Sequence, residues 1–337
     1  MARRAFLLGV VLALAAGCGS SAKRAVSTEV AVAQHQGPPV RAHGQFLVTA
    51  GGGIGVSRGK LYLVDAATGR TRLLSGEPDI LETPRWSPDG TSVLSSATRH
   101  GSDDLISYPV GGGEPENLTA TNRDWEFNGR WSPDGTRIAY LLERKGSDND
   151  LYVARADGGS RRMVARHVDG FAWSPDGRRL AFAPGLARNE GRILTVSVRG
   201  GRAKPLGPAG NGEFIAWGPH GQLLYKNGRN SLPTHLWGKT GDRSLGYVNA
   251  EFLPDGTVAF GSGRWIGFVR HGTARRTTRL IDRPTSYSWS ADGRYLAYVS
   301  AWSGRVYVAR ADGTGIHRLP ARLGTSQIEV FGWRPRT

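Results

Sequence analysis

Carboxylates recur ahead of a short motif that this 337-residue chain repeats, four or five residues before the bulky residue that begins each copy. Glu251 stands directly before one such bulky residue. The other candidates are Glu82, Glu126, Asp169, Glu213 and Glu329. If the copies surround one axis, these side chains would attract cations, amines or basic peptide segments, and crowding would raise some of their pKa values. Alternatively, each carboxylate pairs with a local arginine, such as Arg85, Arg130 or Arg166, and only keeps its loop soluble.

Other residue patterns that could carry chemistry are weak. Residues 55–59 match the G-x-S-x-G pattern around a hydrolase nucleophile, but they lie in an expected β-hairpin connection, whereas that motif needs a strand, a sharp turn and a helix. The eight histidines have no metal-ligand spacing, and residues 148–150 (D-N-D) lack the glycine and the later glutamate of a calcium loop. The sequence therefore predicts no catalytic residue, no metal site and no cofactor.

Two tryptophans outside the repeated motif are candidate contact residues. Trp125 and Trp302 fall in expected connections between strands. Aromatic side chains on loops often belong to contact surfaces. The alternative is that these indoles cover loops against the body of the domain.

The repeated motif reads W-S-P-D-G and is followed by an apolar strand. We call the first residue of each copy its anchor. The anchors are Trp86, Trp131, Trp173, Trp217, Phe252, Trp289 and, in a truncated copy, Trp333. Their spacings are 45, 42, 44, 35, 37 and 44 residues, and fixed periods of about 40–45 residues are typical of four-stranded propeller blades. Proline, aspartate and glycine make the motif a tight turn, and His220 is expected to be a turn variant of the aspartate.

The two ends of the repeat region complement each other. Residues 46–48, 61–64 and 71–74 predict three strands with no anchor before them, whereas residues 329–333 predict an innermost strand with nothing after it. Pairing of the two ends would close the ring and remove exposed strand edges. We therefore expect an all-β, seven-bladed propeller over residues 45–337; six or eight blades fit less well, and six would discard the N-terminal strands.

The W-S-P-D-G copies and the later A-D-G turns resemble the TolB-like, WD40-like (PD40) propeller repeat over nearly the whole region after residue 45. In the family that gives the repeat its name, an α/β domain precedes a six-bladed ring, and this sequence leaves no room for that domain. The resemblance therefore does not imply the Tol-Pal partnership. Propellers of this kind include peptide- and protein-binding modules, a few lyases and the gating domains of serine peptidases, so the fold does not choose among them.

The N-terminus resembles a lipoprotein signal. Arg3 and Arg4 precede an apolar run over residues 6–16 that is too short to span a membrane, and residues 15–18 (A-A-G-C) resemble a lipobox. We expect residues 1–17 to be a signal peptide, Cys18 to carry the lipid, and residues 18–44 to form a flexible tether on the outer face of the cell membrane. The alternative is an ordinary secretory signal with a chance cysteine; Cys18 is the single cysteine of the chain.

The chain is strongly basic, with a formal net charge of +16 at pH 7. Such a charge raises the question of nucleic acid, but an exported protein rarely meets it, and we predict no nucleic-acid partner. One interpretation is attraction of arginine pairs to anionic lipid headgroups or cell-wall polyanions, and the other is base-composition bias of the genome. The pairs concerned are 161–162, 178–179 and 275–276.

Two classes of function remain open. The first is a monomeric, lipid-anchored binding module for an unidentified protein, peptide or cell-wall polymer. The second is a small enzyme, a lyase or hydrolase, with an active site built from loops at the channel mouth. We favour the binding module, because no nucleophile, metal set or acid–base pair is evident.

Overall fold

The structure is a computed structural model that describes residues 41–51, 59–75, 83–99, 101–121, 124–144, 148–185, 192–209, 215–226, 234–239, 241–246, 249–253, 255–262, 265–270, 273–280, 283–324 and 327–335. Pro38–Thr337 form one compact unit. The expected signal peptide, Cys18, most of the tether, Ser57, Glu82 and Glu213 lie outside the described residues.

The described residues form strands and turns and contain no helix. The strands are β1 (Gln45–Ala50), β2 (Lys60–Asp65), β3 (Thr71–Leu73), β4 (Arg85–Trp86), β5 (Ser92–Arg99), β6 (Ser102–Pro109), β7 (Glu116–Asn117), β8 (Trp125–Trp131), β9 (Arg137–Glu143), β10 (Asp150–Arg155), β11 (Arg162–Ala165), β12 (Val168–Trp173), β13 (Arg179–Pro184), β14 (Arg192–Ser197), β15 (Lys204–Ala209), β16 (Ile215–Trp217), β17 (Leu223–Lys226), β18 (Thr234–Gly238), β19 (Gly241–Gly246), β20 (Asn249–Phe252), β21 (Val258–Ser262), β22 (Trp265–Arg270), β23 (Thr273–Arg279), β24 (Pro284–Trp289), β25 (Tyr295–Ser300), β26 (Val306–Arg310), β27 (His317–Arg318) and β28 (Ile328–Trp333). Each of the seven anchors is the last residue of its strand, so the predicted turn ends each of these strands.

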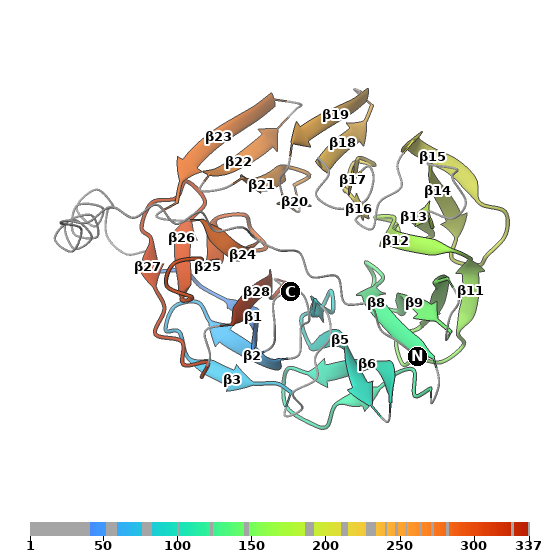
Figure 1. Cartoon of the computed structure of the whole chain (residues 1–337), viewed down its shortest axis with the longest axis horizontal. Coiled ribbons are helices and arrows are strands. Elements are labelled where there is room, and N and C mark those ends of the chain that lie inside the picture. The colour runs from blue at the N-terminus through green and yellow to red at the C-terminus, as the bar shows by residue number, and fades with distance from the viewer. Residues whose placement is uncertain are drawn as a thin grey trace, which may run out of the picture. The chain divides into compact units, whose positions relative to one another are not determined.

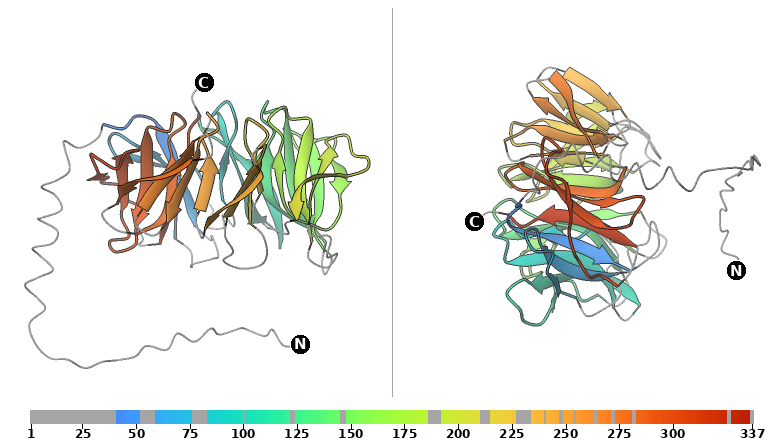
Figure 2. Two further views of the ribbon diagram at one scale, coloured as in Figure 1. Left: turned by 90° about the horizontal axis from the view of Figure 1, so that it is seen from above. Right: turned by 90° about the vertical axis from the view of Figure 1, so that its left-hand side faces the viewer.

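The strands pair mostly with their neighbours in sequence and form antiparallel sheets. Five sheets have four strands: β28-β1-β2-β3, β12-β13-β14-β15, β16-β17-β18-β19, β20-β21-β22-β23 and β24-β25-β26-β27. A sixth, eight-stranded sheet runs β11-β10-β9-β8-β6-β5-β4, with β7 on β6. Its two halves meet in a single parallel residue pair, Asp103 with Trp125. Figure 1 shows the sheets around a common centre, with the anchor strands innermost, and the side views of Figure 2 show their strands running between two faces of the unit. The fold is therefore an all-β propeller.

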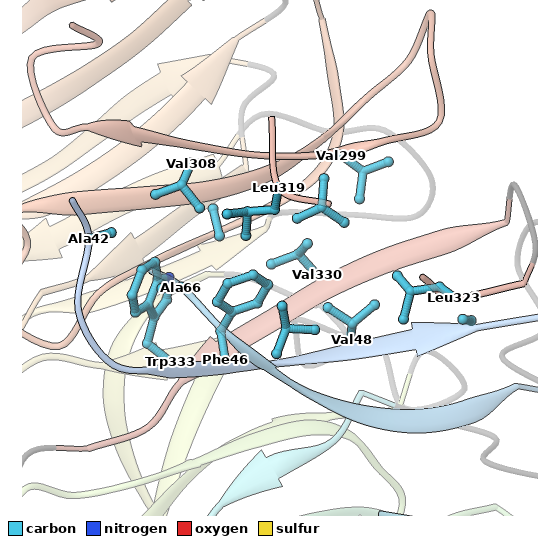
Figure 3. Packing of buried hydrophobic residues seen from close by; sticks show 14 residues of the cluster. Ala42, Phe46, Val48, Ala66, Val299, Val308, Leu319, Leu323, Val330 and Trp333 are labelled. Atoms are coloured by element: carbon cyan, nitrogen blue, oxygen red, sulfur yellow. The ribbon is translucent and has the colours of Figure 1, made fainter. Parts of the chain in front are cut away.

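The predicted pairing of the first and last strands is confirmed. β1 and β28 are antiparallel, with Phe46 opposite Trp333 and Thr49 opposite Glu329. The rings of Phe46 and Trp333 lie 5.3 Å apart between centroids. Both belong to a buried cluster that also contains Val48 and residues of β26 and β28 (Figure 3). Strands from the two ends of the chain thus share one sheet and one core.

The W-S-P-D-G turns use side-chain hydrogen bonds as well as glycine. Ser174 Oγ donates to Asp176 Oδ1 at 2.5 Å and accepts a bond from Arg179 N at 2.9 Å. The copies at Ser87, Ser132 and Ser290 repeat both bonds. Gly177 has φ of 66°, a conformation that favours glycine. The motif therefore forms the tight turn that the sequence predicts.

Anchor tryptophans connect neighbouring sheets. Trp173 Nε1 donates to Arg130 O at 3.1 Å, and Trp333 Nε1 donates to Ser288 O at 3.0 Å. Trp86 Nε1 makes the equivalent bond to Gly332 O at 2.6 Å. Each acceptor stands directly before the anchor of the preceding sheet, so one hydrogen-bond pattern repeats across three sheet boundaries.

Candidate functional site

A cavity of about 560 Å³ lies among the innermost strands. Its lining comes from β4, β8, β16, β20, β24 and β28, together with Thr83 ahead of β4 and one residue each of β17 and β18. These innermost strands face the centre of the ring in Figure 1. The cavity is therefore built by residues that are distant in sequence and that the repeat brings to one place.

The cavity carries charges of both signs. Its cationic residues are Arg85, Arg130 and Lys226, and its carboxylates are Glu251 and Glu329. The Arg130 guanidinium carbon also lies 5.2 Å from the ring centroid of Phe171, in a cation–π contact that holds the side chain at the inner strands. A polar ligand with charges of both signs would find partners on this lining.

Glu251 is a cavity residue whose pKa lies close to neutral pH. Trp289 N donates a hydrogen bond to Glu251 Oε1 at 3.3 Å. Burial raises the pKa of Glu251 to about 7, although this bond and the positive charge of Arg85 oppose the rise. Glu251 can therefore gain or lose a proton near neutral pH, as a general acid or base must.

Aromatic side chains and hydroxyl groups complete the lining. Burial and the charge of Glu251 raise the pKa of the Tyr287 hydroxyl, which stays protonated at neutral pH. Gly261 allows the Tyr287 ring to approach, because a Cβ at that position would lie 2.8 Å from Tyr287 Cε1. The other aromatic and hydroxyl residues of the lining are Thr83, Trp217, Thr234, Phe252, Thr285, Ser286 and Phe331.

The structure brings two of the predicted carboxylates, Glu251 and Glu329, into the cavity. Glu329 is exposed and lines it. Asp169 is partly buried beside a β-bulge in β12 and does not belong to the lining. Glu126 is fully buried instead, and Thr121 Oγ1 donates to its two carboxylate oxygens at 2.9 and 3.0 Å. Burial raises the pKa of Glu126 to about 7.

Sequence reasoning named Glu251 directly before its anchor but missed that Arg85 and Arg130 share this position and line the cavity. Arg85, Arg130 and Glu251 all occupy that position and line the cavity. The pattern was readable, because a charged residue precedes the anchor in three copies. Arg85 and Arg130 were expected only as counter-charges to the carboxylates. The charge at this position, more than the charge four residues earlier, marks the centre of the ring.

The two candidate contact tryptophans differ. Trp125 begins strand β8 and pairs with Glu143, so the expectation that it lies in a connection was wrong. Its side chain is partly buried because β8 continues into the inner part of the sheet. Trp302 lies in the turn between β25 and β26 and is 84 % exposed.

Among the described residues, no group of three or more histidine, cysteine, aspartate or glutamate side chains could hold a metal ion. In the D-N-D segment, Asp148 Oδ2 lies 2.6 Å from His167 Nδ1. The described residues also contain no helix that is long and apolar enough to cross a membrane.

Comparison with family models identifies the domain. Residues 22–233 match the TolB beta propeller domain (PD40), and the chain belongs to this family. The Tol-Pal system protein TolB of Gluconobacter oxydans is 36% identical over 66 residues, which cover 20% of this chain and 15% of that protein. The chain thus spans about one seventh of the curated relative that it matches.

Solved structures share the fold at low sequence identity. TolB from Acinetobacter baumannii aligns over 94% of this chain and 74% of its own length, with a TM-score of 0.56 and 16% identity. An oligogalacturonate lyase in complex with manganese aligns over 85% of this chain and 87% of its own length, with a TM-score of 0.60 and 16% identity. Proteins of one fold thus include a Tol-Pal component and a lyase, and residues of the site must decide the function.

Proposed function

We propose that this protein is an exported binding module that holds a polypeptide segment of a partner protein in the cavity at the centre of the propeller. The cavity itself is the observation that carries the proposal. It joins charges of both signs, hydroxyl groups and aromatic rings in about 560 Å³, a size typical of ligand sites.

A polypeptide fits this lining better than a uniformly charged polymer does. Arg85, Arg130 and Lys226 can bind carboxylates, whereas Glu329 can bind an amine or guanidinium. Peptide groups supply both donors and acceptors for the hydroxyl groups of Thr83 and Thr285, which are exposed residues of the lining. Of the predicted carboxylates, the proposal retains Glu251 and Glu329 as ligand residues.

The proposal includes the architecture and the location of the module. Dividing the eight-stranded sheet at its single parallel pair would give seven sheets of four strands, and we take these as seven blades in a ring that the pairing of β1 with β28 closes. We take this ring to be monomeric and held outside the cell membrane by a lipid on Cys18, with the following residues up to 44 as the tether. Trp302 and Trp125 remain candidates for secondary contacts with the partner.

Site-specific photo-crosslinking in intact cells tests this function. A photoreactive phenylalanine analogue replaces partly buried Phe331 in the cavity, and a control chain carries the analogue at exposed Leu73 on outer strand β3. We expect one protein adduct with the cavity probe, whose crosslinked segment mass spectrometry identifies as an extended peptide. Addition of Glu329→Gln to the Phe331 probe should reduce the adduct.

Two results of the crosslinking experiment would contradict the proposal. Equal adducts from the cavity and from Leu73, or an adduct that is indifferent to Glu329→Gln, would mean that the cavity does not hold the partner. Incorporation of a labelled fatty acid into the wild type, with its loss in Cys18→Ser, would support the lipid anchor separately.

A second candidate function is elimination from an acidic oligosaccharide, in the manner of a lyase. The observation that favours it is Glu251, a carboxyl group with a pKa of about 7 that is influenced by the charge of Arg85. Glu251 would remove the proton from the carbon beside a substrate carboxylate, and Arg85 would stabilise the enolate. The C–O bond at the next carbon would then break to leave a C=C bond, and the leaving oxygen would take up a proton from Glu251 or from water.

Ultraviolet absorbance of the unsaturated product, with oligogalacturonate as the probe, tests this second candidate. Activity that falls at least about 100-fold in Glu251→Gln supports it. Absence of absorbance, or equal rates in wild type and Glu251→Gln, excludes this reaction for the cavity.

A further inference from the structure

A second pocket lies away from the central cavity, between the β25–β26 turn and the segment that leads into β28. Its volume is about 440 Å³, and Arg305, Arg318 and Arg322 contribute to its lining. None of the described residues that line it is acidic. Three guanidinium groups without a carboxylate in one pocket repel one another unless an anion lies between them.

Backbone pairing brings these arginines together. Leu319 N donates to Val306 O at 2.9 Å, so the residues next to Arg305 and Arg318 are hydrogen-bonded neighbours. Arg318 belongs to β27, and Arg322 follows it by four residues. The grouping therefore results from the sheet and not from side-chain flexibility.

Part of the pocket wall belongs to the buried core. Val306, Leu319 and Leu323 contribute to its lining and are also buried members of the cluster around Phe46 and Trp333 (Figure 3). Hydrogen bonds fix the turn before Arg305, where Ser300 N donates to Arg305 O at 3.0 Å and Gly304 N donates to Ser300 O at 2.9 Å. A rigid backbone holds the arginines near one another before any ligand arrives.

Among the described residues, no acidic side chain pairs with Arg305, Arg318 or Arg322. All three are exposed, and within the described residues none of their side chains has an ion pair or hydrogen bond. This distinguishes them from Arg155, which pairs with Asp157, and from Arg144, which pairs with Asp150. Their donors are available to an external anion.

We propose that this pocket binds a phosphate ester. A phosphate group presents several oxygens in different directions and can accept hydrogen bonds from three guanidinium groups. A carboxylate has two oxygens, and the paired N–H donors of one guanidinium group are enough to bind both. Trp302, 84 % exposed in the same turn, precedes the lining residue Ser303 and offers an apolar surface for the esterified part of the ligand. The phosphate ester is supplied by the headgroup of an anionic phospholipid or by a soluble ester.

The first arm of the test uses soluble sn-glycerol 3-phosphate and inorganic phosphate, titrated calorimetrically into the full-length protein in neutral detergent at constant ionic strength. We expect the double variant Arg318→Gln/Arg322→Gln to weaken glycerol phosphate binding at least about tenfold, because each charge-assisted bond is worth more than a neutral one. Arg178→Gln, which removes one exposed arginine elsewhere, should change the Kd less than about twofold. Arg305→Lys, which keeps the charge but not the fork, should fall between wild type and the double variant.

The second arm distinguishes the lipid source. The full-length protein is reconstituted in vesicles of brominated phosphatidylcholine, with or without phosphatidylglycerol, and tryptophan fluorescence is recorded. Headgroup binding predicts quenching that requires phosphatidylglycerol and is lost in Trp302→Phe and in the double arginine variant. Binding of soluble glycerol phosphate without such quenching assigns the pocket to a soluble ester.

The proposal is overturned if the double variant and Arg178→Gln lose equal affinity, because diffuse charge then explains the attraction. It is also overturned if the wild type binds neither probe. The substituted side chains are exposed, so an unchanged unfolding temperature of the double variant confirms that loss of binding is not loss of fold. The central cavity plays no part in either arm, and its photo-crosslinking result stands independently.

Discussion

The sheet β12–β15 and the two sheets that follow it differ at equivalent positions of the repeat. In β12–β15 the anchor Trp173 is buried, and Ser174 closes the turn after it. In the next sheets the anchors Trp217 and Phe252 are followed by Gly218 and Leu253, which have no hydroxyl to close the turn. These two are the only anchors among the residues that line the central cavity.

The glycine after Trp217 has a steric reason. A Cβ at Gly218 would lie 2.7 Å from Phe252 Cζ, so the ring of the next anchor occupies the space that a serine side chain needs. The sheets β16–β19 and β20–β23, which we call the departing sheets, keep the backbone bonds of the turn. A repeat unit can therefore lose the hydrogen bonds of the serine hydroxyl where its anchor lines a cavity.

Replacement of a regular anchor should have the largest effect. Trp173→Ala removes a buried indole and its bond to Arg130 O, and should lower the free energy of unfolding by about 3–5 kcal/mol. Denaturant unfolding measures the change. Trp302→Ala, in which the lost indole is exposed, is the control and should stay within about 0.5 kcal/mol of wild type. Equal losses in both variants would contradict the assignment of the anchors to the core.

The pH dependence of stability compares Glu126, in the sheet that contains β8, with Glu251, in the departing sheet β20–β23. Glu126 and Glu251 both have a pKa of about 7, above the ordinary 4.5. Between these values the folded protein holds protons that the unfolded chain has released, so the free energy of unfolding should fall as pH rises from about 4.5 to about 7 and level off above that. Each group accounts for up to about 3 kcal/mol.

Neutral variants separate the two groups. Glu251→Gln and Glu126→Gln should each flatten this part of the pH curve, as followed by thermal unfolding at several pH values. A ligand in the central cavity should alter the contribution of Glu251 and leave that of Glu126 unchanged. A curve that Glu251→Gln leaves as steep as the wild-type curve would show that this carboxyl group is already ionised at low pH.

Restoring the serine of the regular motif in the departing sheet β16–β19 tests whether packing explains the glycine there. Gly218→Ser should destabilise the protein by about 1–3 kcal/mol, because the new side chain meets the Phe252 ring. It should also reduce photo-crosslinking at Phe331, since Phe252 lines the same cavity. A stabilising Gly218→Ser would mean that the ring moves freely and that the departure from the motif has no packing cause.

Repetition explains why so much of the fold was predictable. Seven anchors at similar spacing locate the inner strands, and the incomplete units at the two ends predict the pairing of Phe46 with Trp333. The site was harder to predict, because β-bulges change which way a side chain points. A bulge between Phe127 and Arg130 separates Glu126 from its anchor, and spacing alone cannot locate it.

The smallest expected effect concerns the regular turn itself. Ser174→Ala removes the hydroxyl that Asp176 and Arg179 share, and should cost about 1 kcal/mol in the free energy of unfolding. The hydroxyl also keeps the pKa of Asp176 below its usual value, so the loss should shrink at acidic pH, where the carboxylate is protonated. Denaturant unfolding at neutral and acidic pH measures both effects. A loss that is the same at both pH values would mean that the serine acts only through the Arg179 backbone bond, a bond that Gly218 cannot make in its own turn.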